Sequence, residues 1–180
     1  MRKKLRWVTE TAIVLALLVT LQALTKGFGQ LVTGSCVNAC LAVATLVAGP
    51  ASGITVALIS PVLAFLLGIA PMPLAVPVIM AGNTAYVLVL WLLAGRTHAL
   101  PRRILGWVAA AAVKFGVLWI LAVGLICNLL RQPLLDSGIL KEPMLKALPV
   151  TFSWPQLVTA LIGGALALVI TPTLKKALHK

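Results

Sequence analysis

Polar side chains recur deep within the apolar stretches of this 180-residue sequence. Gln30, Gly34 and Asn38 are spaced by four residues, so they would share one face of a helix. At a rise of about 1.5 Å per residue, Asn38 and Asn83 would lie about 10 Å and about 13 Å from the ends of their apolar stretches. Amides at that depth in a lipid bilayer need a hydrogen-bonding partner, a cavity or a ligand.

We expect these groups to form an outward-facing polar pocket for a small, neutral or zwitterionic, hydrogen-bonding molecule, on which Trp119 and Trp154 would stack. The alternative is that Asn38 and Asn83 only hold helices together, through interhelical hydrogen bonds that contribute about 0.6 kcal/mol each. The predicted substrate-binding residues are Gln30, Thr33, Asn38, Asn83, Lys114, Asn128, Trp154 and Gln156.

Lys114 is a separate case because it lies about 15 Å inside its apolar stretch, and no acidic residue falls inside any other such stretch. A lysine at this depth cannot easily extend to the membrane surface. It should therefore face the other helices and lose its proton, bond carbonyl or amide oxygens, or meet an anionic group of a ligand. The last option would favour a substrate with a carboxylate, whereas the amides would equally suit a pyrimidine or another nitrogen heterocycle.

The sequence contains no set of residues that predicts catalysis, a metal or a cofactor. His98 and His179 fall in predicted cytoplasmic segments, and the acids Glu10, Asp136 and Glu142 lie near membrane surfaces or in loops. The three cysteines, Cys36, Cys40 and Cys127, lie in apolar stretches and are expected to be small buried residues. No phosphate-binding Gly-Lys-Ser/Thr loop is present, so we expect a protein that is not an enzyme and does not itself use ATP.

The composition is that of an integral membrane protein. Hydrophobic residues make up 61% of the chain and charged residues 10%, with a mean hydropathy of +1.10. The net charge of +12 does not indicate nucleic-acid binding, because the basic residues separate apolar stretches and do not gather in a polar region. The basic N-terminus and the stretch after it are interpreted as a retained first helix without a signal-peptide cleavage site.

Six apolar stretches predict one all-α transmembrane domain over residues 1–180, a six-helix bundle. The third stretch is short, and Ser60-Pro61 within it predicts a kink. The segment from Arg131 to Ser153 is long and rich in proline, which is typical of a lid or a binding loop on the outer side. The predicted helices are 7–24, 31–48, 52–67, 74–94, 104–130 and 154–174.

The distribution of basic residues predicts the orientation in the membrane. The termini and the connections on their side carry ten Lys and Arg residues, against four on the opposite side. Cytoplasmic segments are enriched in these residues, so both termini are expected in the cytoplasm. In the first helix, Ala12 and Ala16 are one turn apart, a spacing that lets another helix approach closely.

Taken together, this pattern resembles the substrate-binding S components of energy-coupling factor (ECF) vitamin transporters, over the whole chain. The resemblance is carried by residues 12–16, Gln30 to Asn38, Gly82-Asn83 and Phe152 to Gln156. It implies a subunit of the bacterial cell membrane that captures a vitamin or similar micronutrient outside and delivers it inward by toppling in the bilayer. The single tyrosine, Tyr86, and the modest aromatic content argue against a large stacked ring system as substrate.

The resemblance also implies partners. Ala12 and Ala16 would dock on a transmembrane coupling subunit, and two cytoplasmic ATPase subunits would hydrolyse ATP. Membrane lipid surrounds the chain and nucleic acid is not a partner. The alternative function is a structural membrane scaffold without a solute, similar in outline to the rod-shape protein MreD, and a membrane enzyme is a more remote option.

Overall fold

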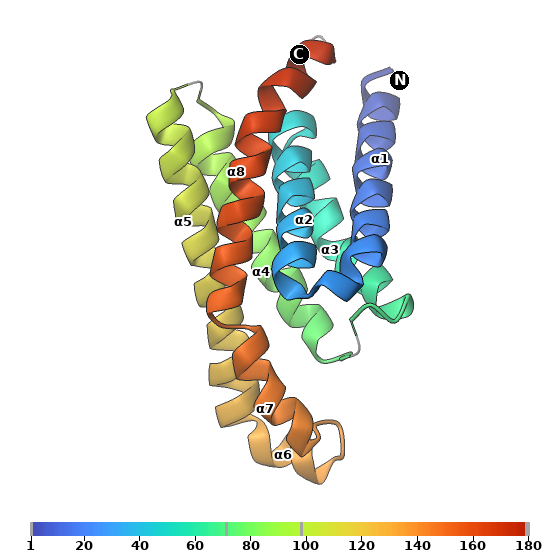
Figure 1. Ribbon diagram of the computed structural model, residues 1–180, viewed down its shortest axis with the longest axis vertical. Helices are drawn as coiled ribbons and strands as arrows, with labels where there is room; N and C mark the ends of the chain where they lie inside the picture. The colour runs from blue at the N-terminus through green and yellow to red at the C-terminus, as the bar shows by residue number, and fades with distance from the viewer. Residues whose placement is uncertain (1, 71, 98, 179–180) are drawn as a thin grey trace.

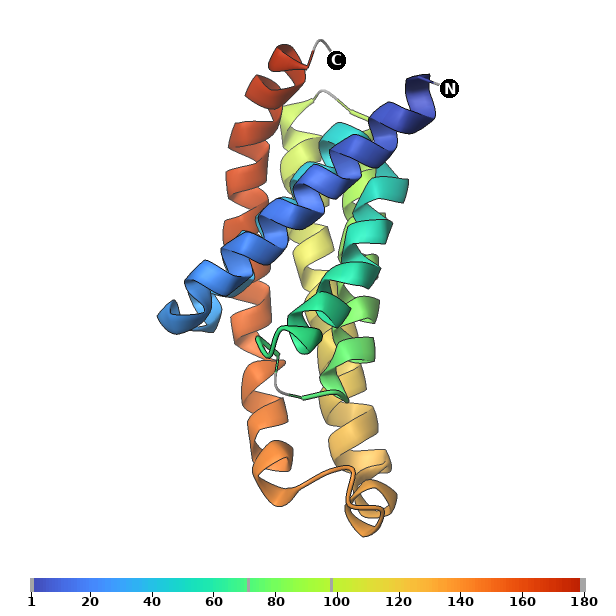
Figure 2. The ribbon, with the colours of Figure 1, turned by 90° about the vertical axis from the view of Figure 1, so that its right-hand side faces the viewer.

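The computed structural model describes residues 2–70, 72–97 and 99–178. The described residues form helices and short connections without any strand, which confirms the all-α prediction. The helices run side by side along the long axis of the molecule, apart from α1, which crosses its neighbours obliquely (Figures 1 and 2). Both ends of the described chain lie at the same end of the bundle (Figure 1). The elements in chain order are α1 (Arg2–Thr25), η1 (Lys26–Phe28), α2 (Gln30–Val43), η2 (Ala44–Ala48), α3 (Pro50–Leu66), α4 (Ala75–Leu90), η3 (Trp91–Gly95), α5 (Leu100–Trp119), η4 (Ile120–Leu129), α6 (Arg131–Asp136), α7 (Glu142–Thr151) and α8 (Trp154–Ala177).

Five of these helical stretches are long and apolar enough to cross a membrane: Lys4–Phe28, Gln30–Ala48, Ala75–Gly95, Leu100–Leu129 and Trp154–Ala177. The third of the six predicted crossings corresponds to α3, Pro50–Leu66, which is apolar but only 17 residues long. A bilayer crossing needs about 20 residues, so the predicted count of six spans is not confirmed. Pro61 lies inside α3 without ending it.

The segment after α5 differs from its prediction. Residues 131–153 are mostly helical, as α6 and α7, and are not a long loop. Helix α5 continues through η4 to Leu129, giving a predominantly apolar helical stretch of 30 residues that extends past the other helices (Figure 1). At 1.5 Å per residue this rod is about 45 Å long, more than the hydrocarbon thickness of a bilayer. Helices α6 and α7 fold back along its far end.

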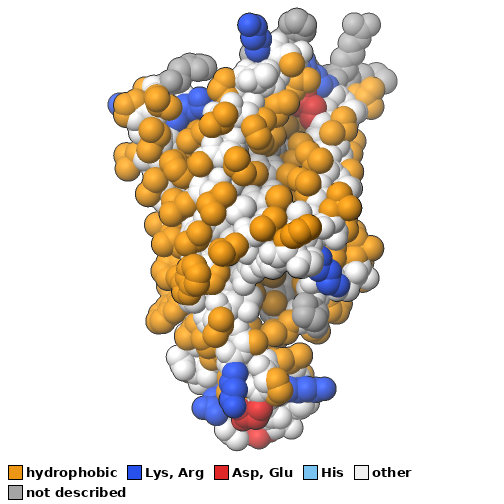
Figure 3. Space-filling view, viewed as in Figure 1, with side chains coloured by type: hydrophobic (Ala, Val, Ile, Leu, Met, Phe, Trp, Pro, Cys, Tyr) orange, Lys and Arg blue, Asp and Glu red, His pale blue; other side chains and the backbone are white. Residues whose placement is uncertain are grey.

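The surface has the banding expected of a membrane protein. Hydrophobic side chains cover the middle of the molecule, and Lys and Arg side chains gather at its two ends (Figure 3). One buried apolar cluster fills the half near the termini and includes Leu41, Val56, Tyr86 and Leu90. A second cluster joins α4, η4 and α7 at the opposite end. We call the half of the bundle away from the termini the distal half.

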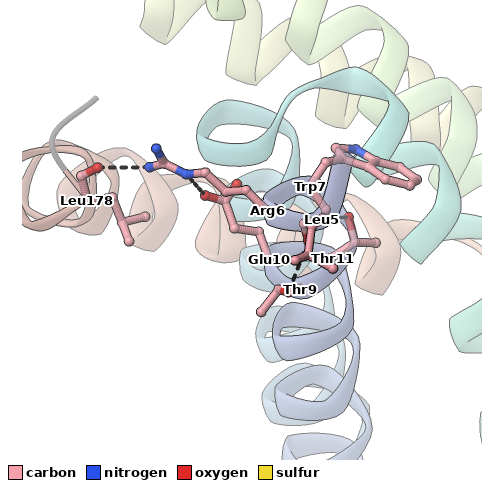
Figure 4. A network of polar contacts seen from close by, with 7 residues as sticks. All are labelled: Leu5, Arg6, Trp7, Thr9, Glu10, Thr11 and Leu178. Atoms are coloured by element: carbon pink, nitrogen blue, oxygen red, sulfur yellow. Dashed lines mark hydrogen bonds and ion pairs between the residues drawn. The ribbon is translucent and has the colours of Figure 1, made fainter. Parts of the chain in front are cut away.

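Helix α1 packs on the bundle through one face, on which Leu18 is fully buried in the core near the termini. The Thr11 Oγ1–Ser52 Oγ hydrogen bond of 2.9 Å is buried between α1 and α3. Arg6 donates to the Leu178 carbonyl at 2.8 Å, and this bond ties α1 to the end of α8 (Figure 4). Arg6 also forms an ion pair with Glu10 of the same helix at 2.9 Å. The opposite face of α1 is exposed.

Candidate substrate-binding site

A cavity of about 450 Å³ lies in the distal half of the bundle. Residues from α1, α2, α3, α4, α5, α7 and α8 line it, together with η1 and the connection between α3 and α4. Its volume falls within the range of small-molecule sites, about 300 to 1,000 Å³. Six of the eight residues predicted to bind substrate are in its lining: Gln30, Thr33, Asn38, Asn83, Lys114 and Gln156.

The side-chain nitrogen of Lys114 lies between the two predicted amides. Its Nζ donates to Asn38 Oδ1 at 2.6 Å and to Asn83 Oδ1 at 2.7 Å. The three side chains are buried, with Lys114 only 3% exposed. They come from three helices, α2, α4 and α5, so the predicted polar groups do converge. Their contacts also fit the alternative of interhelical bonding, and the polar atoms that these contacts leave unpaired distinguish the two.

The orientation of Asn38 is fixed by its other contacts. Its Nδ2 donates to the Gly34 carbonyl at 2.9 Å and to Thr159 Oγ1 at 3.2 Å, so Oδ1 faces Lys114. Close packing of α2 against α8 makes this possible. A Cβ at Gly163 would lie 2.5 Å from the Ser35 carbonyl oxygen and 2.6 Å from Asn38 Cβ, closer than a side chain tolerates.

Close packing of two helices also positions Asn83, but its amide nitrogen is unpaired. Its neighbour Gly82 lets α4 approach Leu118 of α5, where an added Cβ would lie 2.5 Å from a leucine methyl. Asn83 Nδ2 is buried and has no hydrogen-bond partner among the described residues. Gln22 Oε1 is also buried and unpaired, and Gln22 lines the same cavity. Buried unpaired polar atoms are costly, so two in one cavity indicate positions for ligand or solvent.

The rim of the cavity is held by long polar side chains. Gln30 Nε2 donates to the Thr151 carbonyl at 2.7 Å, and Gln156 Nε2 donates to the same oxygen at 3.2 Å. Lys26 Nζ donates to the Gly68 carbonyl at 2.6 Å. These bonds join the starts of α2 and α8 to α7, and η1 to the connection after α3. Gln30 and Gln156 therefore both hold the end of α7 through the Thr151 carbonyl.

Two predicted residues are placed elsewhere. Asn128 is exposed near the end of η4, and Trp154 is 60% exposed at the start of α8. Neither lines the cavity, and the partner proposed for stacking, Trp119, is exposed as well. Asn128 lies outside the cavity because it is near the end of the long α5–η4 rod, which extends beyond the cavity.

Sequence reasoning missed several lining residues. Gln22 and Ser60 are polar groups inside apolar helices, so the rule that selected Asn38 would also have selected them. Lys26 lies in a connection and is signalled only by its charge. Met72 and Phe152 are apolar and carry no such signal.

The described residues contain no group of three or more His, Cys, Asp or Glu side chains arranged to hold a metal ion. Cys36, Cys40 and Cys127 are unbridged, and the last two are buried. His98 and His179 lie outside the described residues. The polar and charged groups that line the cavity offer hydrogen bonding and charge recognition.

The residues predicted to dock on a partner lie on the open face of α1. Ala12 and Ala16 are both exposed, as are their neighbours Ile13 and Leu17. This face is available for a partner helix or for lipid.

Comparison with known proteins identifies one match. A family model described as ECF transporter, substrate-specific component, matches residues 6–175, which is nearly the whole chain. No curated protein and no solved structure matches the chain significantly.

Proposed function

Because this chain belongs to the family of substrate-specific components of ECF transporters, we propose that it captures a vitamin or similar micronutrient outside the cell and delivers it inward with an energising module. The observation that carries the proposal is the cavity in the distal half, where a buried lysine and two buried amides from three helices meet. Its size suits a vitamin-sized molecule.

The orientation follows from charge. With the termini in the cytoplasm, as the excess of basic residues on their side favours, the distal half and the cavity face outward. The rim bonds around Thr151 and Gly68 then lie on the substrate's route of entry. The membrane would be the bacterial cell membrane.

Energy would come from partner subunits. The open face of α1, with Ala12 and Ala16, would dock on a transmembrane coupling subunit, because small residues let helices approach closely. ATP hydrolysis would take place in two cytoplasmic ATPase subunits, and this chain would bind substrate without catalysing a reaction. A scaffold without a solute offers no reason for a cavity that contains a buried lysine.

Native mass spectrometry of the detergent-purified protein tests the binding function. The wild type should carry a small molecule after expression in rich medium or after incubation with a vitamin mixture. Ala70→Trp should abolish this mass, because Ala70 lines the cavity and an indole there would fill it. Ala112→Trp is the matched control, since Ala112 is exposed on α5 outside the cavity lining. Absence of a bound molecule from the wild type under both conditions, or equal retention by both variants, contradicts the proposal.

A further inference from the structure

Resting on the proposed function, we propose that the substrate carries one carboxylate group, which binds in the cavity against Lys114 and Asn83. Three features of the described residues lead to this substrate class: the charge of the cavity lining, the hydrogen bonds that Lys114 and Asn83 leave unmade, and the presence of a single deeply buried cation.

The lining is positively charged and contains no acid. Its charged side chains among the described residues are Lys26 and Lys114. The sequence has only three acidic residues, and each lies elsewhere: Glu10 pairs with Arg6, Glu142 lies 4.0 Å from Arg131, and Asp136 accepts from Gln132. The partners of Lys114 are neutral amides. A buried ammonium without a counter-ion is unfavourable, and a ligand carboxylate would supply the missing charge.

The unmade hydrogen bonds point to the same group. With a ligand carboxylate beside it Lys114 is charged and has three N–H donors, of which Asn38 and Asn83 use two. The ring of Tyr86 is 5.7 Å from Nζ, near the outer limit of a cation–π contact, and is a weak alternative to a third hydrogen bond. Asn83 Nδ2 is unpaired beside the same ammonium. A carboxylate has two acceptor oxygens, one for each of these donors.

The number of cations favours a monoanion. Lys26 lies at the rim, is exposed and already donates to the Gly68 carbonyl, so Lys114 is the one deeply buried cation in the described lining. A phosphate dianion would leave a net negative charge buried there, which is costly. The rest of the lining is largely apolar, including Val37, Pro61 and Ile79, and suits an uncharged body attached to the carboxylate.

The test compares acids with their own carboxamides, which differ in charge but hardly in shape. The probes are nicotinate with nicotinamide, biotin with biotinamide, and indole-3-acetate with indole-3-acetamide. Binding is measured on the purified wild type by the shift in thermal unfolding and by calorimetry. We expect at least one acid to bind, and to bind about tenfold or more tightly than its amide, as a hydrogen-bonded charge pair requires.

Lys114→Gln should remove that preference. Its affinity for the acid should fall about tenfold or more, while its affinity for the amide stays within about threefold of the wild type. A purely structural Lys114 would lower both affinities together. The comparison of acid and amide on the wild type decides the matter even where this variant does not fold.

The proposal is overturned by amides that bind as tightly as their acids, by an uncharged copurifying compound, or by a wild type that binds none of the acids. An uncharged copurifying compound leaves the binding function standing and removes only the carboxylate. A wild type that binds no acid and carries no copurifying molecule removes both.

Discussion

Helices α8 and α1 both carry small residues at helix-packing positions, but only α8 uses them inside the chain. Gly163 and Gly164 of α8 are buried, and α2 packs directly on the first of them. In α1, Ala12 and Ala16 are exposed. Only 11% of the most apolar 18-residue stretch of this helix is buried, against 33% of the corresponding stretch of α8. Small residues therefore position the cavity where they face inward, and leave a contact surface free where they face outward. Substitutions in the two helices should have opposite consequences for folding and transport.

The largest effect on stability is expected from Gly163→Ala. The new Cβ would lie 2.5 Å from the Ser35 carbonyl oxygen and 2.7 Å from the Ala39 nitrogen, both backbone atoms that cannot move alone. Overpacking of this kind costs about 1 to 3 kcal/mol. Separation of α2 from α8 should also displace Asn38 and weaken ligand binding. Thermal unfolding in detergent measures the first effect, and calorimetry measures the second.

Gly116→Ala is the matched control for this prediction. It lies in α5, and a Cβ there meets nothing within 4 Å. Its stability should stay unchanged or rise, by up to about 1 kcal/mol, because alanine is the better helix former. Equal stabilities for the two variants would mean that the α2–α8 contact can relax and does not fix the cavity.

Asn83→Asp should separate stability from binding. The aspartate would accept from Lys114 Nζ, which is 2.7 Å from the amide oxygen in the wild type, and would replace the unpaired Nδ2 donor by a second acceptor oxygen beside the same ammonium. A charged acceptor for a buried ammonium should raise the free energy of unfolding by about 1 kcal/mol. The internal carboxylate would also repel a ligand carboxylate, so binding of acids should be lost. Asn128→Asp, at an exposed position outside the cavity, should change neither quantity. Undiminished acid binding by Asn83→Asp would contradict the proposed role of Lys114.

Ala16→Trp tests the open face of α1. Since Ala16 is exposed, the indole should change the free energy of unfolding by less than about 0.5 kcal/mol and leave ligand binding intact. Uptake by cells that contain the partner subunits should nevertheless be lost, because a bulky side chain would keep the partner helix away. Ala112→Trp, on the exposed face of α5, should leave uptake unchanged. Normal uptake by Ala16→Trp would show that this face does not dock.

Part of this architecture could be predicted from the sequence. The depth of polar residues in apolar stretches identified Asn38, Asn83 and Lys114, because lipid makes unpaired polar groups costly at any position. The pairing of these residues could not be predicted, since it depends on helix crossings at Gly163 and Gly82 that periodicity does not encode.

At the distal end the structure differs from the sequence pattern for two physical reasons. The prolines of residues 131–153 predict a loop, yet Pro143 lies in the first turn of α7, where its missing N–H costs nothing and its fixed φ favours a helix. Asn128 lies near the end of its apolar stretch, and the α5–η4 rod carries that end beyond the cavity. Asn128 therefore does not line the cavity.

The smallest effect is expected from Arg6→Gln, which loosens α1 where it is tied to α8. Arg6 donates to the Leu178 carbonyl at 2.8 Å and pairs with Glu10 at 2.9 Å, and its side chain is exposed (Figure 4). Exposed ion pairs contribute less than about 1 kcal/mol, so thermal unfolding should hardly change, and raised salt should remove what difference there is. Hydrogen exchange should accelerate in the first turns of α1 and stay constant in the middle of α8, while Arg102→Gln, at the exposed start of α5, should alter neither helix. A loss of stability as large as that of Gly163→Ala would contradict the contrast between α1 and α8. The attachment of α1 would then depend on the exposed contacts of Arg6 and not on the buried bond between Thr11 and Ser52.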